Sequence, residues 1–205
     1  MSSTLELPEG LSAGEVRAAV RDRYSQVGVH PEGSYNFKVG RAFAEALGYP
    51  KAVLDQLPPG VYEAFTGVAT PSLRAEVHPG EVVVDLGCGG GLDLSLCAWM
   101  VGARGRVVGI DFAPGMVDRA RRNIELLSLR QAEVRLAPAE GTGLGDASAD
   151  WVIANGILNL SPDKEAVLTE VVRILRPGGR FLLAETALSA ALPAGKGKTL
   201  QDWFR

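Results

Sequence analysis

Short apolar runs alternate with amphipathic stretches along the sequence from residue 82 to residue 185. Five of the runs have the length and composition of buried strands, at residues 82–86, 107–111, 132–136, 151–155 and 181–185. Between them apolar residues recur at helical spacing, as at Val117, Ala120 and Ile124, with Arg119 and Arg121 on a solvated face. Strands that alternate with helices predict a doubly wound, Rossmann-like α/β fold with a mostly parallel sheet in the order 3-2-1-4-5.

The first 79 residues show no strand pattern. Ser12 and Glu15 carry the signature of a capping box, and helices are predicted to about Tyr24, near 39–47 and at 51–56. We expect this N-terminal segment to pack over one edge of the sheet as a lid. The chain then divides into a helical segment at 1–79, an α/β core at 80–187, and a linker with a C-terminal segment at 188–205.

Composition restricts the classes of function. The 205 residues are 46% hydrophobic and 22% charged, and the net charge of -3 gives no electrostatic case for binding nucleic acid. No apolar run reaches the length of a membrane span, and the start lacks the features of a signal peptide. Cys88 and Cys97 alone cannot form a disulfide framework or a metal site, and His78 beside Pro-Gly is typical of a solvated turn. We therefore expect a cytoplasmic protein without a bound metal, whose partner is a small molecule.

The first predicted strand runs directly into a glycine-rich turn and then into an apolar helix. The turn reads D-x-G-x-G-x-G, with Asp85, Gly87, Gly89 and Gly91. A dinucleotide-binding fingerprint needs its third glycine at the next position, where this sequence has Leu92, so a nicotinamide enzyme is disfavoured. A tight turn that serves only packing is the other alternative.

The D-x-G-x-G-x-G turn resembles the motif of class I S-adenosylmethionine (SAM) methyltransferases. The resemblance implies SAM as the cofactor and S-adenosylhomocysteine (SAH) as the product. Gly87 and Gly89 would let the backbone approach the methionine end of the cofactor, where a Cβ would collide with it. Asp85 would engage the ammonium group of the cofactor. Cys88, inside the turn, is counted among the cofactor-binding residues but not as a catalyst.

An acid ends the second predicted strand. Asp111 follows Gly91 by twenty residues, a separation at which a carboxylate can accept both ribose hydroxyls of the cofactor. An acid that ends a strand without such a role is the alternative. Phe112 and Met116 follow, and they either line the adenine or belong to the core.

Two further segments belong to the predicted site. SAM enzymes of this class carry Asp-Ala-Glu or a variant where this sequence has 137–140, and Pro138 replaces the acid that accepts from the adenine amino group. Glu140 is retained, and the backbone near Ala139 can still contact the ring. Asn155 ends the fourth strand at the edge where ligands bind in such sheets, so it completes the predicted cofactor site.

Within this superfamily the chain is similar to the arsenite methyltransferase group over most of its length. The similarity lies in segments 47–50, 85–91, 110–111, 159–164 and 175–179. That group binds trivalent arsenic through cysteine thiolates, which suit a soft centre. Two of these cysteines would fall near Val68 and at Gly156, neither of which can ligate arsenic. A third would follow an aromatic segment such as 202–204.

The sequence stops directly after that segment. Class I methyltransferases add a helix and a β-hairpin after the fifth strand, so the resemblance implies that the C-terminal strands are missing. One hypothesis is a selenocysteine codon after Arg205 that has been read as a stop, with a reactive selenol or thiol beyond it. A genuine end or a cloned fragment is the alternative. An open edge at the fifth strand predicts a homodimer through that edge.

The sequence therefore predicts a SAM-dependent methyltransferase that acts on a small molecule, such as a metalloid or another soft nucleophile. No histidine, cysteine or carboxylate is singled out as a general base, so no catalytic residue is assigned. The alternative from another class is a SAM-binding protein without catalytic activity, or a truncated selenoprotein methyltransferase.

Overall fold

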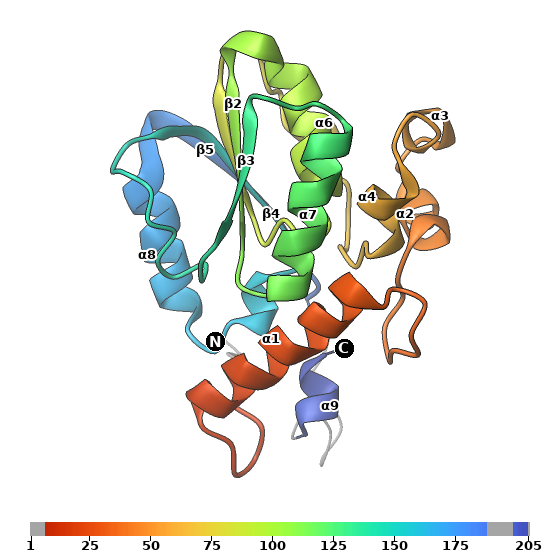
Figure 1. The fold of residues 1–205 in the computed structure, drawn as a ribbon. Coiled ribbons are helices and arrows are strands. Elements are labelled where there is room, and N and C mark those ends of the chain that lie inside the picture. Colours follow the sequence, from red (N-terminus) through yellow and green to blue (C-terminus); the bar gives the residue numbers. More distant parts are fainter. Residues whose placement is uncertain (1–6, 188–198, 205) are drawn as a thin grey trace.

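In the computed structural model, which describes residues 7–187 and 199–204, five strands form one sheet. The strands are β1 (Val82–Leu86), β2 (Arg106–Asp111), β3 (Ala132–Leu136), β4 (Ala149–Asn155) and β5 (Leu175–Ala184). Their order is β3-β2-β1-β4-β5, and every neighbouring pair is parallel. The predicted sheet and its order are confirmed (Figure 1).

Helices cover both faces of the sheet. α6 (Leu92–Val101) and α7 (Pro114–Leu126) lie on one face, and α8 (Lys164–Ile174) lies on the other (Figure 1). Consecutive strand residues face opposite layers: Val83 packs in the cluster under α6 and α7, whereas Val84 packs with residues of α8. Because both faces are buried, the central strands read as continuous apolar runs rather than alternating ones.

The N-terminal segment is helical, as predicted. Its helices among the described residues are α1 (Ala13–Val29), α2 (Arg41–Leu47), α3 (Lys51–Leu54), α4 (Pro59–Glu63) and α5 (Pro71–Arg74). Figure 1 shows α1 crossing beneath the carboxyl ends of the strands, with α2 to α4 grouped beside α6. The predicted capping box is present, since Glu15 N donates to Ser12 Oγ and Ser12 N donates to Glu15 Oε2. The apolar pattern does not predict the short helices α4 and α5.

α1 and α7 cross with their backbones in direct contact. A Cβ at Gly28 would lie 2.3 Å from the carbonyl carbon of Gly115, and one at Gly115 would lie 2.2 Å from the oxygen of Ser25. Arg119 on α7 donates its Nε to Gly28 O at 2.6 Å. The expectation of a solvated face is therefore wrong for Arg119, whose side chain is only 12% exposed because it satisfies the carboxyl end of α1.

The C-terminal segment packs against α1. α9 (Leu200–Trp203) follows the predicted linker, most of which lies outside the described residues at 188–198. Trp203 and Phe204 are buried with Val16 and Val20 of α1. Trp203 Nε1 also donates to the carbonyl of Leu160, in the short 3-10 helix η2 (Leu158–Leu160) after β4, at 3.2 Å. A second 3-10 helix, η1 (Gly102–Arg104), follows α6.

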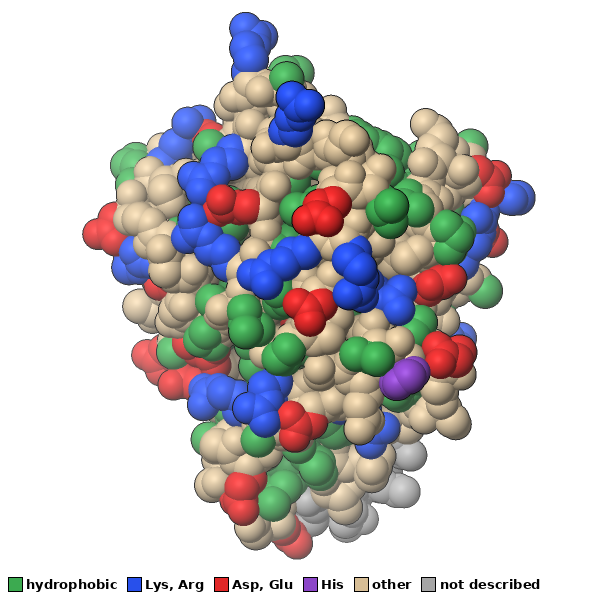
Figure 2. Space-filling view, viewed as in Figure 1, with side chains coloured by type: hydrophobic (Ala, Val, Ile, Leu, Met, Phe, Trp, Pro, Cys, Tyr) green, Lys and Arg blue, Asp and Glu red, His purple; other side chains and the backbone are tan. Residues whose placement is uncertain are grey.

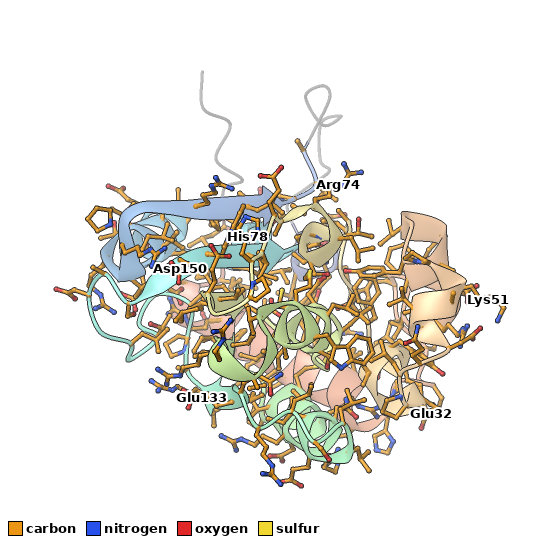
Figure 3. The ribbon with its side chains drawn as sticks, turned by 90° about the horizontal axis from the view of Figure 1, so that it is seen from above. Glu32, Lys51, Arg74, His78, Glu133 and Asp150 are labelled. Atoms are coloured by element: carbon orange, nitrogen blue, oxygen red, sulfur yellow. The ribbon has the colours of Figure 1, made fainter. Side chains whose placement is uncertain are left out.

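The surface carries charges of both signs. Figure 2 shows basic and acidic side chains interspersed on this face, in keeping with a net charge of -3. Seen from above (Figure 3), His78 and Asp150 lie at the amino ends of β1 and β4, where Val82 N donates to Asp150 Oδ2 at 2.8 Å. His78 is exposed there, as the turn pattern predicts. None of the helices in the described ranges is long and apolar enough to cross a membrane.

Candidate functional site

One cavity lies between the carboxyl ends of β1, β2 and β4 and helix α1. It holds about 1020 Å³ of space that no atom fills, its open mouth included. Because parallel strands end at the same edge, residues far apart in the sequence meet there. All ten residues of the predicted cofactor site line it, namely Asp85, Gly87, Cys88, Gly89, Asp111, Phe112, Met116, Ala139, Glu140 and Asn155.

Asp85 presents a buried carboxylate to this cavity. The residue is 2% exposed, and its Oδ2 has no hydrogen-bond partner among the described residues. Burial raises its pKa well above the usual range, and the neighbouring carboxylates of Asp93 and Asp111 raise it further. A buried carboxylate oxygen without a partner is costly, so a cationic or hydrogen-bond-donating ligand group at this position would relieve that cost.

The glycine turn after β1 is open to the cavity at Gly89. Gly89 has φ +52°, and a Cβ built there would have only Met116 Sδ nearby, at 4.0 Å. Gly87 also lines the cavity, and it meets a second steric requirement, because a Cβ there would lie 2.1 Å from Cγ2 of Ile157. Its lack of a side chain first permits the loop after β4 to pack against the turn. Gly89 thus remains the position at which backbone can meet a ligand.

Asp111 ties the glycine turn to the end of β2. Its Oδ2 accepts from Gly89 N at 2.9 Å and its Oδ1 accepts from Ala113 N at 2.9 Å. Burial raises the pKa of this carboxyl group. Each carboxylate oxygen retains a second lone pair, so Asp111 is held rigidly by the backbone and can still accept two hydroxyl groups.

The opposite end of the cavity is closed by α1 and by the loops after β3 and β4. Met116 belongs to the hydrophobic core, with 1% of its surface exposed, and it also lines the cavity together with Phe112 and Ala139. Glu140 accepts from Arg17 Nη2 of α1 at 3.0 Å and from Ser161 Oγ at 2.9 Å. The same oxygen, Oε1, accepts both hydrogen bonds, so Oε2 is available to accept from a ligand. Glu140 therefore joins the N-terminal helix to the core across the cavity.

A buried polar network in the wall of the cavity was not predicted. Asp93, at the start of α6, accepts from the hydroxyls of Tyr49 (2.7 Å) and Ser72 and from Asn155 Nδ2 (2.9 Å). Burial raises the pKa of Asp93, while these donors lower it. A single acid in an otherwise apolar helix was the one signal in the sequence. Its partners come from the N-terminal segment at distances along the chain that no local pattern reveals.

The sulfur chemistry of the site is limited. Cys88 and Cys97 are free and buried, and burial raises the pKa of both thiols well above the usual range. A Cβ at Gly109 would lie 2.8 Å from Cys88 Sγ, which places that sulfur against β2. The two positions of the expected arsenic-binding cysteines adjoin each other, because a Cβ at Gly156 would lie 3.2 Å from Cγ1 of Val68. Searched over the described ranges, the chain has no group of three His, Cys, Asp or Glu residues that could hold a metal ion.

Known proteins are similar to this chain in sequence, and solved structures are similar to it in fold. An arsenite methyltransferase of Halobacterium salinarum is 31% identical over 193 residues, which cover 87% of this chain and 49% of that protein. One of Aquipseudomonas alcaligenes is 33% identical over 147 residues, covering 66% and 40%. The chain thus spans at most about half the length of these curated relatives.

Solved structures of methyltransferases superimpose on this chain. An arsenic(III) S-adenosylmethionine methyltransferase of Chlamydomonas reinhardtii superimposes with a TM-score of 0.57 at 30% identity, over 76% of this chain and 52% of that one. A SAM-dependent methyltransferase of Aquifex aeolicus shares the fold alone, with a TM-score of 0.53 at 19% identity over 89% and 79%. A family model described as a methyltransferase domain matches residues 77–205, from the start of the core onward. With its sheet order, its glycine turn and this match over more than half of its length, the chain belongs to the methyltransferase domain family and has the fold of SAM-dependent methyltransferases.

Proposed function

We propose that this chain binds SAM in the cavity at the carboxyl ends of the strands and transfers its methyl group to a small-molecule acceptor. The observation that carries the proposal is the unpartnered Oδ2 of buried Asp85, beside the open turn at Gly89. The methionine part of SAM carries an ammonium group, which fits an orphaned carboxylate oxygen. It also carries a carboxylate, which fits backbone N–H groups at the start of a helix.

The residues divide the cavity into two walls. The cofactor wall consists of Asp85, Gly89 and Asp111, and Asp111 would accept the ribose hydroxyls while Phe112, Met116 and Ala139 surround the adenine. The acceptor wall consists of Thr66, Gly67, Gly156 and Ile157, which also line the cavity but come from the loops after α4 and β4. Bound SAM supplies a methyl group activated by its sulfonium centre. The chain would align the acceptor with that methyl group and exclude water.

The acceptor has to be a nucleophile that needs little help from a base. Both histidines of the sequence, His30 and His78, are exposed and lie outside the cavity lining. The carboxylates at the cavity are engaged or buried beside one another, as described for Asp85 and Asp111. We therefore infer a soft or already ionised acceptor, such as a small thiol or selenide. Val68 and Gly156 provide no thiolates for trivalent arsenic, so arsenite is the less favoured acceptor.

The experiment has two stages. Calorimetric titration with SAM and SAH tests binding, and transfer of a labelled methyl group to dithiothreitol, selenide and arsenite tests catalysis. We expect SAM to bind and the thiol to be methylated. Gln131→Ala serves as the control, because Gln131 Nε2 donates to Ala98 O at 2.7 Å at the end of the sheet away from the cavity. Absence of SAM binding would contradict the proposal. Tight binding without product from any acceptor would favour the non-catalytic alternative.

A further inference from the structure

The side-chain amide of Asn155 makes all of its hydrogen bonds within the protein. Its Oδ1 accepts from Val68 N at 2.7 Å and from Ala69 N at 3.1 Å. Its Nδ2 donates to Ala69 O at 2.9 Å and to Asp93 Oδ2 at 2.9 Å. An amide has two lone pairs and two N–H groups, so no hydrogen-bonding capacity remains for a ligand. The predicted role of Asn155 as a direct contact to the cofactor is thereby disfavoured.

These bonds fix a backbone segment rather than a side chain. Residues 66–69 join α4 to α5, and Thr66 and Gly67 of this segment line the cavity. The backbone lies flat against the amide, because a Cβ at Gly67 would come within 2.5 Å of Asn155 Nδ2. Asn155 lies at the end of a strand, and its side chain thus holds part of the acceptor wall by bonds to the backbone of Val68 and Ala69.

The hydrogen-bond partners of the amide determine which way it faces. The N–H groups of Val68 and Ala69 require an acceptor and Ala69 O requires a donor, so the oxygen of Asn155 points towards these N–H groups and the nitrogen away from them. The nitrogen also donates to Asp93, whose carboxylate accepts from the hydroxyls of Tyr49 and Ser72 in the N-terminal segment. The network therefore connects the amide to further parts of that segment.

A second buried asparagine offers a comparison on the other wall. Asn123 of α7 is 2% exposed, and its Nδ2 donates to Gly90 O at 2.8 Å. Gly90 belongs to the glycine turn, which is part of the proposed cofactor region. Each wall is therefore held by one buried amide that bonds to its backbone.

We propose that Asn155 is a positioning residue that holds the 66–69 backbone in place as the acceptor wall, with Asp93 as a further hydrogen-bond partner of its amide. This inference rests on the proposed function, because the wall has an acceptor to align only if the cavity carries out methyl transfer. Asn155 then contributes to the alignment of the acceptor and leaves the affinity for the cofactor unchanged.

The test compares Asn155→Ala with Asn123→Ala, and uses Gln131→Ala as the control for loss of a partly buried amide elsewhere. In Asn155→Ala we expect the Val68 and Ala69 amides to exchange with solvent at least about tenfold faster, because they lose their acceptor. The Kd for SAH should stay within about threefold of wild type, since no cofactor contact is removed. Methyl transfer to dithiothreitol should lose up to about 100-fold in kcat, because small misplacements of the acceptor are costly.

Asn123→Ala should behave in the opposite way. Its SAH affinity should fall about tenfold, since the glycine turn loses a buried hydrogen bond, while Val68 and Ala69 keep their protection. Asn155→Asp keeps the oxygen that accepts from Val68 and Ala69 but loses the donor to Asp93 and to the carbonyl of Ala69. We expect its exchange rates to lie between those of wild type and Asn155→Ala, a graded rescue that a simple loss of packing would not produce.

The outcomes separate the inference from the proposed function. If wild-type protein does not bind SAH, the proposed function fails. The exchange rates of Val68 and Ala69 still show whether Asn155 holds the 66–69 backbone. If Asn155→Ala loses SAH affinity as strongly as Asn123→Ala, Asn155 contacts or supports the cofactor and the inference is wrong. If the backbone amides of Val68 and Ala69 stay protected in Asn155→Ala, Asn155 does not hold the 66–69 backbone and the inference is equally wrong.

Discussion

The two walls of the cavity are built in different ways. The cofactor wall comes from two neighbouring strand ends, where Asp111 bonds directly to the Gly89 amide of the turn after β1. The acceptor wall comes from the N-terminal segment and from β4, joined by the buried amide of Asn155 and the carboxylate of Asp93. One wall is thus a local motif on a sheet edge, and the other exists only through contacts between distant parts of the chain. A local motif can be recognised in a sequence, whereas a set of distant contacts cannot, and under the proposed function the composition of the second wall would decide which acceptor fits.

The largest effect is expected on the cofactor wall. Asp111→Ala should lower the affinity for SAM about 100-fold or more, because two charge-assisted hydrogen bonds to hydroxyl groups are lost. Isothermal titration calorimetry of the variant and of Gln131→Ala gives the comparison. Unchanged SAM binding in Asp111→Ala would refute the ribose role and, with it, the proposed cofactor wall.

The next effect sharpens the account of the acceptor wall. Asp93→Ala should lower the free energy of unfolding by about 3 kcal/mol, because the hydroxyls of Tyr49 and Ser72 and one N–H of Asn155 lose their acceptor. Tyr49→Phe removes one of these bonds and should cost about 1 kcal/mol. Urea denaturation of both variants measures the difference. A loss in Asp93→Ala no larger than that in Tyr49→Phe would mean that the network is not cooperative.

A gain of function would show what the acceptor wall determines. The double variant Val68→Cys/Gly156→Cys places two thiols side by side, since a Cβ at Gly156 adjoins Cγ1 of Val68. We expect it to bind arsenite more tightly than wild type, at a stability cost of about 1 kcal/mol for a side chain at φ +76°. Each single variant is the control, because one thiolate binds trivalent arsenic weakly. Arsenite binding equal to that of wild type would show that these positions do not face the acceptor.

The smallest effect is expected where the two walls meet α1. Glu140→Gln weakens the ion pair with Arg17, whose side chain is 41% exposed. Since solvent screens such a pair, the loss in the free energy of unfolding should be only about 0.5 kcal/mol. Thermal unfolding of Glu140→Gln beside wild type measures it. A loss several times larger would mean that α1 depends on this contact for its position.

The sequence predicted most of the fold and the residues that meet at the cavity from β1 and β2, for physical reasons. Strands buried on both faces read as apolar runs, and the glycine turn needs positive φ at Gly87 and Gly89, so both leave clear patterns. The acceptor wall left no such pattern. The partners of Asn155 lie 62 to 87 residues away along the chain, and only the folded N-terminal segment brings them together.

Particular residues show where reasoning from pattern fails. Arg119 lies on the polar side of an amphipathic helix, yet it is buried against the end of α1 because a glycine contact brings the two backbones together. Gly87 was assigned to the cofactor, but its missing side chain first makes room for Ile157. For Arg119 the expected neighbour, solvent, was wrong, whereas for Gly87 the structure adds a neighbour and the contact with the cofactor stays a prediction.

The most direct measurement is calorimetric titration of SAH into wild type and Asp85→Asn, in buffers of different ionisation enthalpy between about pH 5 and pH 8. Burial and the neighbouring carboxylates of Asp93 and Asp111 raise the pKa of Asp85, which favours its protonated form in the free protein relative to an exposed aspartate. A bound ammonium group favours the ionised form and lowers that pKa, so binding should release a proton in wild type and not in Asp85→Asn. NAD, titrated in parallel, should not bind. Binding of SAH with the same proton release in both proteins, or binding of NAD in place of SAH, would contradict the proposed cofactor site.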